Sequence, residues 1–386
     1  MKVKDICSLQ NGRAFKPSDW CTEGLPIIRI QNLNDVNAPF NYYAGEYNPV
    51  HEINDGELLF SWSGTPGTSF GAFRWYRGKG VLNQHIFRVI PKITVDKEYL
   101  KYALNGNIAT IIAKAHGGVG LQHITKKELD EIDIPIVSEG KQQEIVDVLQ
   151  RAEKIIDLRK NELVRFDELI KARFVEMFGD TEHNSNDYIQ LRLGDICDLQ
   201  NGYAFKSGDY VDSSNVNNCR MSNIRPDGGF DADYSPKYFP DEFWERYSAY
   251  RLYDGDVIIA MTDMASDPKI LGVPTIVKSK GKKFLLNQRV GKLVFSDNDQ
   301  FNRIFLMRFL SQNYIRKNLA KKAGGSTQIN VGKPAILDIG ILKPPIDSQN
   351  QFASFVQQVD KSKVAVKNSL DEAKVLFDSL MQEYFG

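Results

Sequence analysis

DICSLQNGRAFK, residues 5–16, returns as DICDLQNGYAFK, residues 195–206. Ten of the twelve positions are identical, and the offset between the two stretches is 190 residues. Self-similarity of this kind is typical of a repeated structural unit. The chain of 386 residues is also longer than one hydrophobic core usually serves. We therefore predict two copies of one globular domain.

Further matches follow in the same order and show where the two copies differ in length. The offset rises to 199 and then 204, is 207 at the Gly-Gly pair and 206 at the glutamine that follows, and stays at 207 from Glu144 to Gly179. The matched pairs after the first are Asp55-Gly56 with Asp254-Gly255, Leu82-Asn83-Gln84 with Leu286-Asn287-Gln288, Gly117-Gly118 with Gly324-Gly325, Gln122 with Gln328, and Glu144 with Gln351. Length changes are therefore confined to the globular part, whereas the last segment of each copy has a fixed length.

The fixed-length segment of each copy has the pattern of one long helix. Apolar residues recur at three- and four-residue steps through residues 139–178, and residues 348–386 repeat this pattern. Such spacing gives a helix one apolar face. A helix of forty residues is about 60 Å long, which is unusual for a surface helix of a globular domain. We expect the two helices to cover each other's apolar faces as an antiparallel coiled coil.

Short β-type runs and turns fill the rest of each copy. Apolar, β-favouring runs at residues 26–30, 57–60 and 86–90 stand between turns that contain Gly, Asn or Pro. We predict an α+β protein in which two mixed α/β domains form a pseudo-two-fold repeat, separated by the two long helices. The expected division is residues 1–138 for the first domain, 139–185 for a central spacer helix, 186–347 for the second domain and 348–386 for a C-terminal spacer helix.

The charge of the chain is balanced, with 49 Lys and Arg against 49 Asp and Glu. Residues 1–138 carry 15 basic and 14 acidic side chains, residues 186–347 carry 22 and 19, and the stretch between them carries 8 and 11. The small positive excess therefore lies in the two domains, where basic side chains could neutralise phosphate. The positive charge is most concentrated in a basic run that includes Lys282 and Lys283. Such runs also occur on solvated surfaces that bind nothing.

The cysteines and the hydropathy exclude several classes of protein. Cys7, Cys21, Cys197 and Cys219 have no C-x-x-C spacing and no histidine cluster beside them, which argues against a zinc site or a disulfide framework. The N-terminal residues lack the apolar segment of a signal peptide, and no run of about 18 apolar residues occurs. We expect a cytoplasmic protein that has no membrane span and binds no metal.

A duplicated mixed domain with a long helix after each copy resembles the specificity subunits of type I restriction–modification systems. The resemblance covers essentially the whole chain. It rests on Leu-Gln-Asn-Gly at residues 9–12 and 199–202, the Asp-Gly-acid turns, the Leu-Asn-Gln triplets, and the Gly-Gly loops ahead of Gln122 and Gln328. Each motif is weak singly, but the shared order in both copies, followed by the long helices, makes the resemblance specific.

This resemblance implies a non-catalytic subunit whose two target-recognition domains each bind one half of a split site in double-stranded DNA. The paired helices would fix the gap between the halves and would be the docking surface for partners. The implied partners are two methyltransferase (modification) subunits and restriction/translocase subunits. No cofactor is expected on this chain, since S-adenosylmethionine, ATP and Mg²⁺ would be bound by the partner subunits.

Residues near the loops that differ between the copies are candidates for recognising different bases, so we expect an asymmetric target. Polar side chains distinguish base edges in the major groove, and glycine lets the backbone approach phosphate closely. The predicted DNA-binding residues are Arg29, Gln31, Asn32, Ser61, Ser63, Thr65, His85, Gly117, Gly118 and Gln122 in the first domain, and Arg220, Ser222, Asn223, Arg225, Thr262, Lys282, Lys283, Arg289, Gly324, Gly325, Thr327 and Gln328 in the second. The Leu-Asn-Gln triplets, identical in both copies, are expected to maintain the shared fold.

Other classes of function stay open on the sequence. A repeat-built protein-interaction scaffold would need no DNA contact. A fused adenine methyltransferase would need an Asn-Pro-Pro-aromatic loop, and residues 37–40, Asn-Ala-Pro-Phe, lack one proline and have no counterpart in the second copy. Asp133 and Glu139 with Lys141 could suggest a Mg²⁺-dependent nuclease. The second copy lacks this set, and acidic residues at a helix start are favoured by the helix dipole, so no catalytic residue is predicted.

Overall fold

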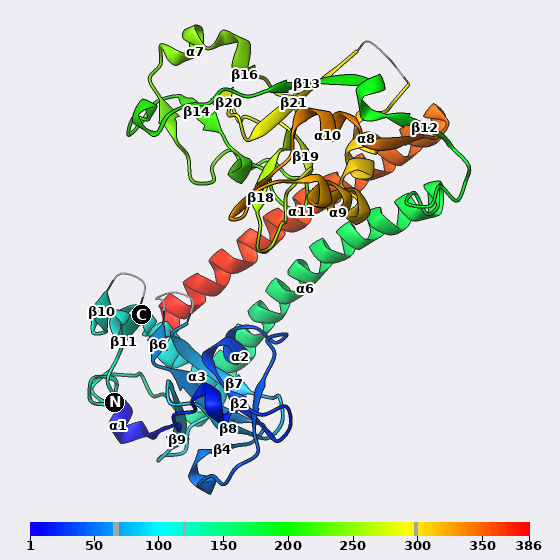
Figure 1. Cartoon of the computed structure of the whole chain (residues 1–386). Coiled ribbons are helices and arrows are strands. Elements are labelled where there is room, and N and C mark those ends of the chain that lie inside the picture. The colour runs from blue at the N-terminus through cyan, green and yellow to red at the C-terminus, as the bar shows by residue number, and fades with distance from the viewer. Residues whose placement is uncertain (65–68, 119–120, 297–299) are drawn as a thin grey trace. The chain divides into compact units, whose positions relative to one another are not determined.

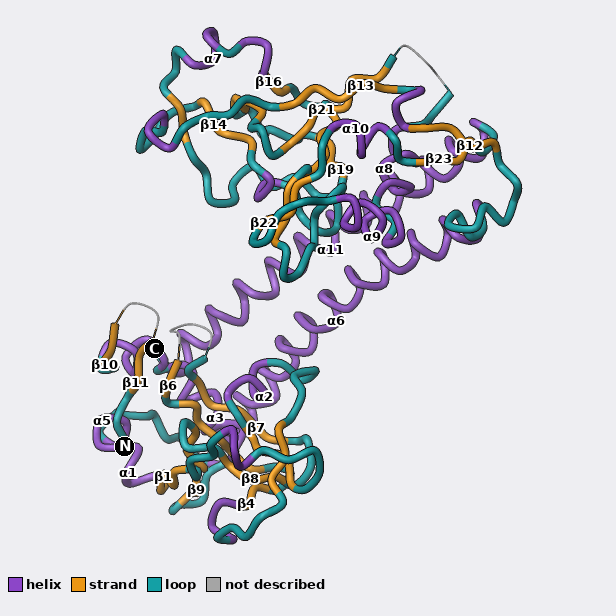
Figure 2. Tube along the Cα trace, in the orientation of Figure 1, coloured by secondary structure: helices purple, strands orange, loops and turns teal. Residues whose placement is uncertain are grey.

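The computed structural model describes residues 1–64, 69–118, 121–296 and 300–386 (Figures 1 and 2). These residues form two compact units, of which unit 1 comprises residues 1–163 and 365–386 and unit 2 comprises residues 164–364. Each unit holds one domain of mixed helix and strand together with segments of both long helices. The predicted α+β repeat is therefore confirmed. None of the helices in the described residues is long and apolar enough to cross a bilayer.

The two long helices have almost the predicted bounds. Helix α6 spans Glu139–Phe178 and ends seven residues before the predicted end of the central spacer at residue 185. Helix α11 spans Ile346–Phe385 and begins two residues before its predicted start. In unit 1 the beginning of α6 and the end of α11 share one apolar core, and in unit 2 the end of α6 and the beginning of α11 do the same. The two helices therefore pack together in antiparallel directions.

The ends of both helices rest on the domain cores, which the expectation of a coiled coil along the whole apolar face did not include. In unit 2 the rings of Phe174 and Phe178 lie 5.8 and 4.7 Å from Phe305, which belongs to the domain. In unit 1 the ring of Phe385 lies 5.4 Å from Tyr99. In each unit a short helix of the domain therefore packs an aromatic side chain against the ends of α6 and α11. For this reason each compact unit contains one domain together with parts of both long helices.

The central sheet of each domain has the same strand order and is antiparallel throughout. Along the first strand, the buried residues Cys7 and Leu9 of unit 1 and Cys197 and Leu199 of unit 2 alternate with more exposed ones, as expected for a strand with one face on a core. The sheet of unit 1 consists of β1 (Cys7–Asn11), β9 (Ile86–Pro91), β5 (Glu57–Ser61) and β7 (Gly71–Trp75). The sheet of unit 2 consists of β13 (Cys197–Asn201), β21 (Val290–Phe295), β17 (Val257–Ala260) and β19 (Pro274–Ile276).

A second four-stranded sheet is also repeated strand for strand, and its two central strands are parallel. In unit 1 it consists of β3 (Asn41–Tyr43), β2 (Leu25–Ile28), β8 (Gly80–Leu82) and β4 (Glu52–Ile53). In unit 2 it consists of β15 (Tyr238–Phe239), β14 (Val216–Cys219), β20 (Lys283–Leu286) and β16 (Arg251–Leu252). The pseudo-two-fold repeat therefore extends to the topology of both sheets.

Short strands and helices complete each domain. Unit 1 adds β6 (Ser63–Gly64), β10 (His116–Gly118), β11 (Leu121–His123), α1 (Val3–Ile6), α2 (Ile30–Asn34), α3 (Lys97–Gly106), α4 (Ile108–Ala113) and α5 (Lys126–Asp130). Unit 2 adds β12 (Ile189–Arg192), β18 (Thr262–Met264), β22 (Gln328–Asn330), β23 (Gly340–Lys343), α7 (Phe243–Arg246), α8 (Arg303–Leu310), α9 (Asn313–Lys322) and α10 (Lys333–Leu337). Short 3₁₀ turns lie at Pro17–Asp19, Pro49–His51, Leu193–Asp195, Ser207–Asp209, Met221–Asn223 and Ser248–Tyr250.

The repeated Asn-Gly and Leu-Asn-Gln motifs meet each other inside each domain. A Cβ atom on Gly12 would lie 2.1 Å from the carbonyl oxygen of Asn83, and one on Gly202 would lie 2.1 Å from that of Asn287. Real Cβ atoms do not approach oxygen so closely, so only glycine allows this contact between the two segments. The motifs that the copies share therefore join the two sheets, which supports their expected structural role.

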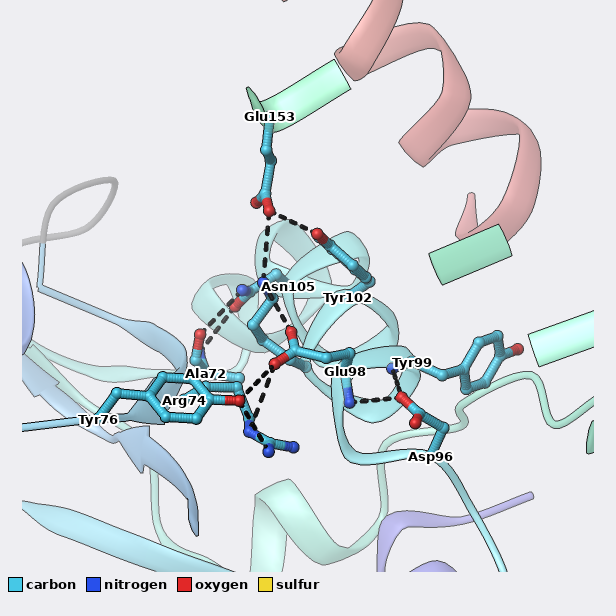
Figure 3. Close-up of polar contacts among 10 residues, drawn as sticks. Ala72, Arg74, Tyr76, Asp96, Glu98, Tyr99, Tyr102, Asn105 and Glu153 are labelled. Carbon is cyan, nitrogen blue, oxygen red and sulfur yellow. Dashed lines mark hydrogen bonds and ion pairs between the residues drawn. The ribbon is translucent and has the colours of Figure 1, made fainter. Parts of the chain in front are cut away.

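A chain of polar contacts ties β7, α3 and α6 together in unit 1 (Figure 3). The carboxylate of Glu98 lies 3.4 Å from Arg74 Nε and 3.1 Å from Lys101 Nζ. Lys101 also lies 3.5 Å from Glu153 of α6, and the hydroxyl of Tyr102 donates to the same carboxylate at 2.5 Å. Burial, followed by the Glu153 carboxylate, raises the pKa of Tyr102. The sheet, the short helix and the long helix are thus linked by charges that are partly removed from water.

Candidate nucleic-acid interface

Three of the predicted residues in unit 1, Arg29, Gln31 and His85, surround one pocket of about 210 Å³. They come together because β2 and β8 are parallel neighbours, so that the chain leaves both strands at the same edge of the sheet. The amide of Asn83 donates to the carbonyl of Ile28 at 3.1 Å and holds the two exits side by side. Side chains on these loops can therefore act together on one ligand.

The side chains around this pocket are held in different ways. The guanidinium of Arg29 donates to Asn41 Oδ1 at 2.7 Å and lies over the ring of Trp20, 5.1 Å from its centroid. Gln31 is exposed, and its Nε2 donates to the carbonyl of Pro39 at 3.3 Å. The guanidinium of Arg29 is thus held in one orientation by two partners, whereas the exposed Gln31 has one long hydrogen bond.

His85 lies at the rim of the same pocket with its ring edge against Trp62, at a centroid distance of 5.2 Å. Its Nδ1 atom is buried and finds no hydrogen-bond partner among the described residues. Burial lowers the pKa of the His85 imidazole, which is therefore neutral at neutral pH. Its Nε2 atom lies 3.0 Å from Gln84 Nε2. Since Nδ1 is buried, Nε2 is the ring nitrogen that a base edge could reach, in exchange for the contact with Gln84.

A small sheet collects four further candidates in unit 1. Ser63 pairs with His123, Gly64 pairs with Gln122, and Gln122 also pairs with Gly117. The side chain of Gln122 is not described, so only the backbone places it here, and the same holds for Gly117 and Gly118. Thr65 lies outside the described residues. Strands β10 and β11, the first of which carries the two glycines, therefore form one sheet with β6, the strand that follows β5 in the chain.

Unit 2 has the corresponding arrangement between β18 and β22, where Met264 pairs with Gln328. Thr327 and Gly324 are exposed next to this pair. At Gly325 the backbone φ is +125°, and a Cβ atom would lie 2.0 Å from the carbonyl oxygen of Gln328. The turn itself therefore requires glycine at this position, and phosphate contact is not needed to explain it.

The arginines near the second sheet of unit 2 have local partners. Arg220 Nη2 donates to the carbonyl of Ser235 at 2.5 Å, and the Arg225 guanidinium lies over the ring of Tyr234, 4.6 Å from its centroid. The hydroxyl of Ser222, between them in sequence, is buried without a hydrogen-bond partner in the described structure. Arg220 occupies the position in unit 2 that Arg29 occupies in unit 1, at the end of the parallel strand.

Arg289 stands where the first copy has His85, directly after the Leu-Asn-Gln triplet. It is exposed, and within the part of the chain that the structure describes its guanidinium makes no hydrogen bond or ion pair. An uncommitted, exposed guanidinium on a loop has the bidentate donors that guanine accepts in the major groove. Among the predicted residues of unit 2, Arg289 is the strongest candidate for contacting a base.

The basic run around Lys282 is partly neutralised by an acidic partner. Lys280 and Lys282 lie 2.7 and 2.6 Å from Asp233, and these two ammonium groups hold the pKa of its carboxyl at about 2. Lys283 is exposed, with its ammonium 5.4 Å from the ring centroid of Trp244. Lys283 therefore offers a freer positive charge than Lys282.

Four predicted residues are unsuited to base contact because they are buried and bonded within their own domain. Asn32, Ser61, Asn223 and Thr262 are between 0 and 3% exposed. Each asparagine accepts a hydrogen bond from the backbone of the arginine three residues earlier and donates to a nearby carbonyl. The sequence contains a signal for this role, since Arg-x-x-Asn occurs in both copies at an offset of 191. A motif shared by both copies maintains the fold, and we remove these four residues from the candidate set.

The residues that could suggest a methyltransferase or a nuclease, namely residues 37–40, Asp133 and Glu139, belong to loops, bridges or helix ends of the fold. Ala38 and Pro39 accept hydrogen bonds from the side chain of Asn32, which closes the loop that resembles a methyltransferase motif. Asp133 forms a β-bridge with Lys2, and Glu139 begins α6. In the described ranges we find no group of three or more His, Cys, Asp or Glu side chains that could hold a metal ion.

A family model for the type I restriction modification DNA specificity domain matches the chain twice, at residues 1–165 and residues 186–373. The chain belongs to the type I restriction modification DNA specificity family. The two matches cover both copies of the repeat, including the larger part of each long helix.

Relatives of this specificity-family chain extend over its whole length. It is 24% identical over 398 residues to the Type I restriction enzyme MjaVIII specificity subunit of Methanocaldococcus jannaschii, with 97% of this chain and 89% of that protein covered. The crystal structure of the S subunit of a type I system from M. genitalium has a TM-score of 0.55 at 15% identity, over 100% of this chain and 95% of that one. A chain from a structure concerned with complex assembly and conformational transition of the type I R-M system has a TM-score of 0.56 at 16% identity, over 100% and 96%. These similarities to solved structures show a shared fold.

Proposed function

We propose that this chain is the DNA-reading subunit of a type I restriction–modification complex and that each domain binds one half of an asymmetric split target. The observation that carries the proposal is the strand-for-strand repetition of two sheets whose exit loops bear different side chains, such as His85 in one copy and Arg289 in the other. Two domains with the same sheets but different side chains on their loops favour two half-sites of different sequence. Helices α6 and α11, each about 60 Å long, would set the number of base pairs between the halves.

Selection of DNA from a random pool tests this function. The full chain, assembled with methyltransferase subunits of its system, is mixed with random duplexes, and the bound DNA is sequenced. We expect two short blocks of defined sequence separated by unspecified base pairs. Absence of any enriched motif would contradict DNA recognition and favour a protein-interaction scaffold. Methyl transfer by the isolated chain would instead establish a fused methyltransferase.

We also propose that catalysis and its cofactors belong to partners, namely two methyltransferase subunits and restriction/translocase subunits that bind S-adenosylmethionine, ATP and Mg²⁺. The paired helices are the proposed docking surface. In unit 1, Ile155 and Leu158 of α6 and Val375 and Leu376 of α11 are large apolar side chains that are 45–69% exposed. Large apolar side chains left in water on a helix are suited to contact with a protein partner.

The change Leu158→Asp weakens binding of a methyltransferase subunit by about tenfold to a hundredfold, because burying a leucine side chain contributes about 1.5–3 kcal/mol. Binding is measured by titrating the purified subunit against the full chain. Asn161→Asp, which adds the same charge close by on α6 without removing an apolar group, is the control. Equal affinity of the wild-type chain and the Leu158→Asp chain would exclude this part of α6 from the interface.

The change Arg289→Ala relaxes base preference at one position in the half-site of the second domain, at a cost of about 1–3 kcal/mol if the contact is bidentate to guanine. His85→Ala, at the matched position of the first domain, relaxes a position in the other half-site only. Both variants are compared with the wild-type chain in the random-pool selection. If Arg289→Ala weakens binding equally on every sequence, the guanidinium contacts phosphate and not a base.

A further inference from the structure

A buried carboxylate closes one loop of unit 2 at its base. Asp263, on β18, is 5% exposed. Its Oδ2 accepts hydrogen bonds from the backbone amides of Ile270 at 2.5 Å and Leu271 at 2.9 Å, and its Oδ1 accepts one from Met264 at 2.8 Å. Three amide donors on one buried carboxylate fix both ends of the intervening loop, residues 264–269, in one arrangement.

Two further hydrogen bonds hold the same loop from its sides. The amide of Ala265 donates to the carbonyl of Thr327 at 3.0 Å, next to the β18–β22 pair. Arg316 of α9 donates from Nη1 to the carbonyl of Lys269 at 2.8 Å. The loop therefore lies beside the predicted contact residues around Gln328, and its backbone is fixed before any ligand arrives.

The loop presents a pair of opposite charges to solvent. Lys269 Nζ lies 3.0 Å from Asp267 Oδ2, and these side chains are 64 and 69% exposed. Exposed ion pairs of this kind contribute little to stability, so a ligand can replace the contact at small cost. Lysine donates to O6 and N7 of guanine, and a carboxylate accepts from the N4 amino group of cytosine, so the pair matches the two edges of one G·C base pair.

We propose that Lys269 and Asp267 recognise one G·C base pair in the half-site of the second domain and that Asp263 is the positioning residue for this loop. The inference rests on the proposed function. It adds two residues that contact DNA and the base pair that they recognise. The first copy has Gly64 where the second has Asp263, so the carboxylate anchor belongs to one half of the target only.

The test applies the random-pool selection to the full chain with its methyltransferase subunits, for Lys269→Ala, Asp267→Asn and Asp263→Asn. We expect Lys269→Ala and Asp267→Asn to lower the preference for one G·C pair about tenfold to a hundredfold, with the other half-site and the gap unchanged. Asp263→Asn replaces an acceptor that faces the amide of Met264 with an amino group. This change should lower the preference for the same G·C base pair. Lys361→Ala, an exposed lysine of α11 in unit 2, is the control for loss of positive charge.

Three results would overturn the inference. The first is an unchanged motif for Lys269→Ala, and the second is an equal loss of affinity on all sequences, which would make Lys269 a phosphate contact. The third is an Asp263→Asn chain that loses affinity for random DNA and for the motif alike, since a merely structural role would give that result. If the wild-type chain enriches no split motif at all, the proposed function fails as well, so the two failures are distinguished by the wild-type selection.

Discussion

Replacing Phe385 by alanine destabilises unit 1 by about 3–5 kcal/mol, the usual cost of truncating a buried aromatic side chain, and leaves unit 2 as stable as before. The Phe385 side chain is 5% exposed, and its ring lies 5.4 Å from that of Tyr99 in a core that otherwise consists mainly of residues 3–149. A residue at the end of α11 thus completes a domain whose sheets come from the other end of the sequence.

The matched variant is Phe178→Ala, because Phe178 lies 207 residues earlier and ends α6 in the same way. Its side chain is 1% exposed, and its ring lies 4.7 Å from Phe305 in unit 2. Hydrogen exchange followed by mass spectrometry of the full chain reports on the two units separately. Phe385→Ala should lower protection in the sheets of unit 1, and Phe178→Ala in those of unit 2. Equal loss of protection in both units for either variant would contradict two separate cores.

Inserting seven residues into each long helix lengthens the gap between the two half-sites by about three base pairs. Seven residues add about 10.5 Å of helix, and one base pair occupies about 3.4 Å of duplex. Seven residues are close to two full turns, so the apolar faces rotate by only about 20°. The insertions belong between Leu163 and Val164 and between Val364 and Ala365, where the compact units divide, so that neither core is changed.

The gap is measured by random-pool selection with the wild-type chain and the doubly inserted chain. Both half-site sequences should be unchanged, since the loops that we propose to contact bases are untouched. An insertion into α6 alone is the control, because helices of unequal length cannot keep both domain contacts and the split motif should be lost. An altered half-site sequence, or a gap of the wild-type length in the doubly inserted chain, would contradict the role of the helices as a spacer.

The repeat and the long helices could be predicted because each corresponds to a pattern that is visible in the sequence. The motif at residues 5–16 and its copy identify equivalent strands, and the constant offset of 207 identifies segments that tolerate no length change. The contact between Gly12 and Asn83 could not be predicted, because nothing in the sequence says that these two repeated segments touch. The packing of the helix ends on the domain cores was missed for the same reason.

The burial of the candidate residues was less predictable from the sequence, since residue type does not tell which way a polar side chain points. Arg29, Gln31 and His85 surround one pocket, and Arg289 is exposed and unpaired in the described structure, as a contact residue should be. Asn32, of the same chemical class, is buried and holds a turn. The positioning role that we propose for Asp263 could not be predicted, because a carboxylate that accepts from three amides has no sequence signature.

The most direct test of the proposal that this chain both recognises DNA and sets the gap between two half-sites is the map of methylated sites in cells that express it with the proposed partner subunits. We predict two short defined blocks, different from each other, separated by one constant number of unspecified base pairs at every methylated site. A single uninterrupted motif, or blocks whose separation varies from site to site, would contradict two domains held at a set distance by α6 and α11.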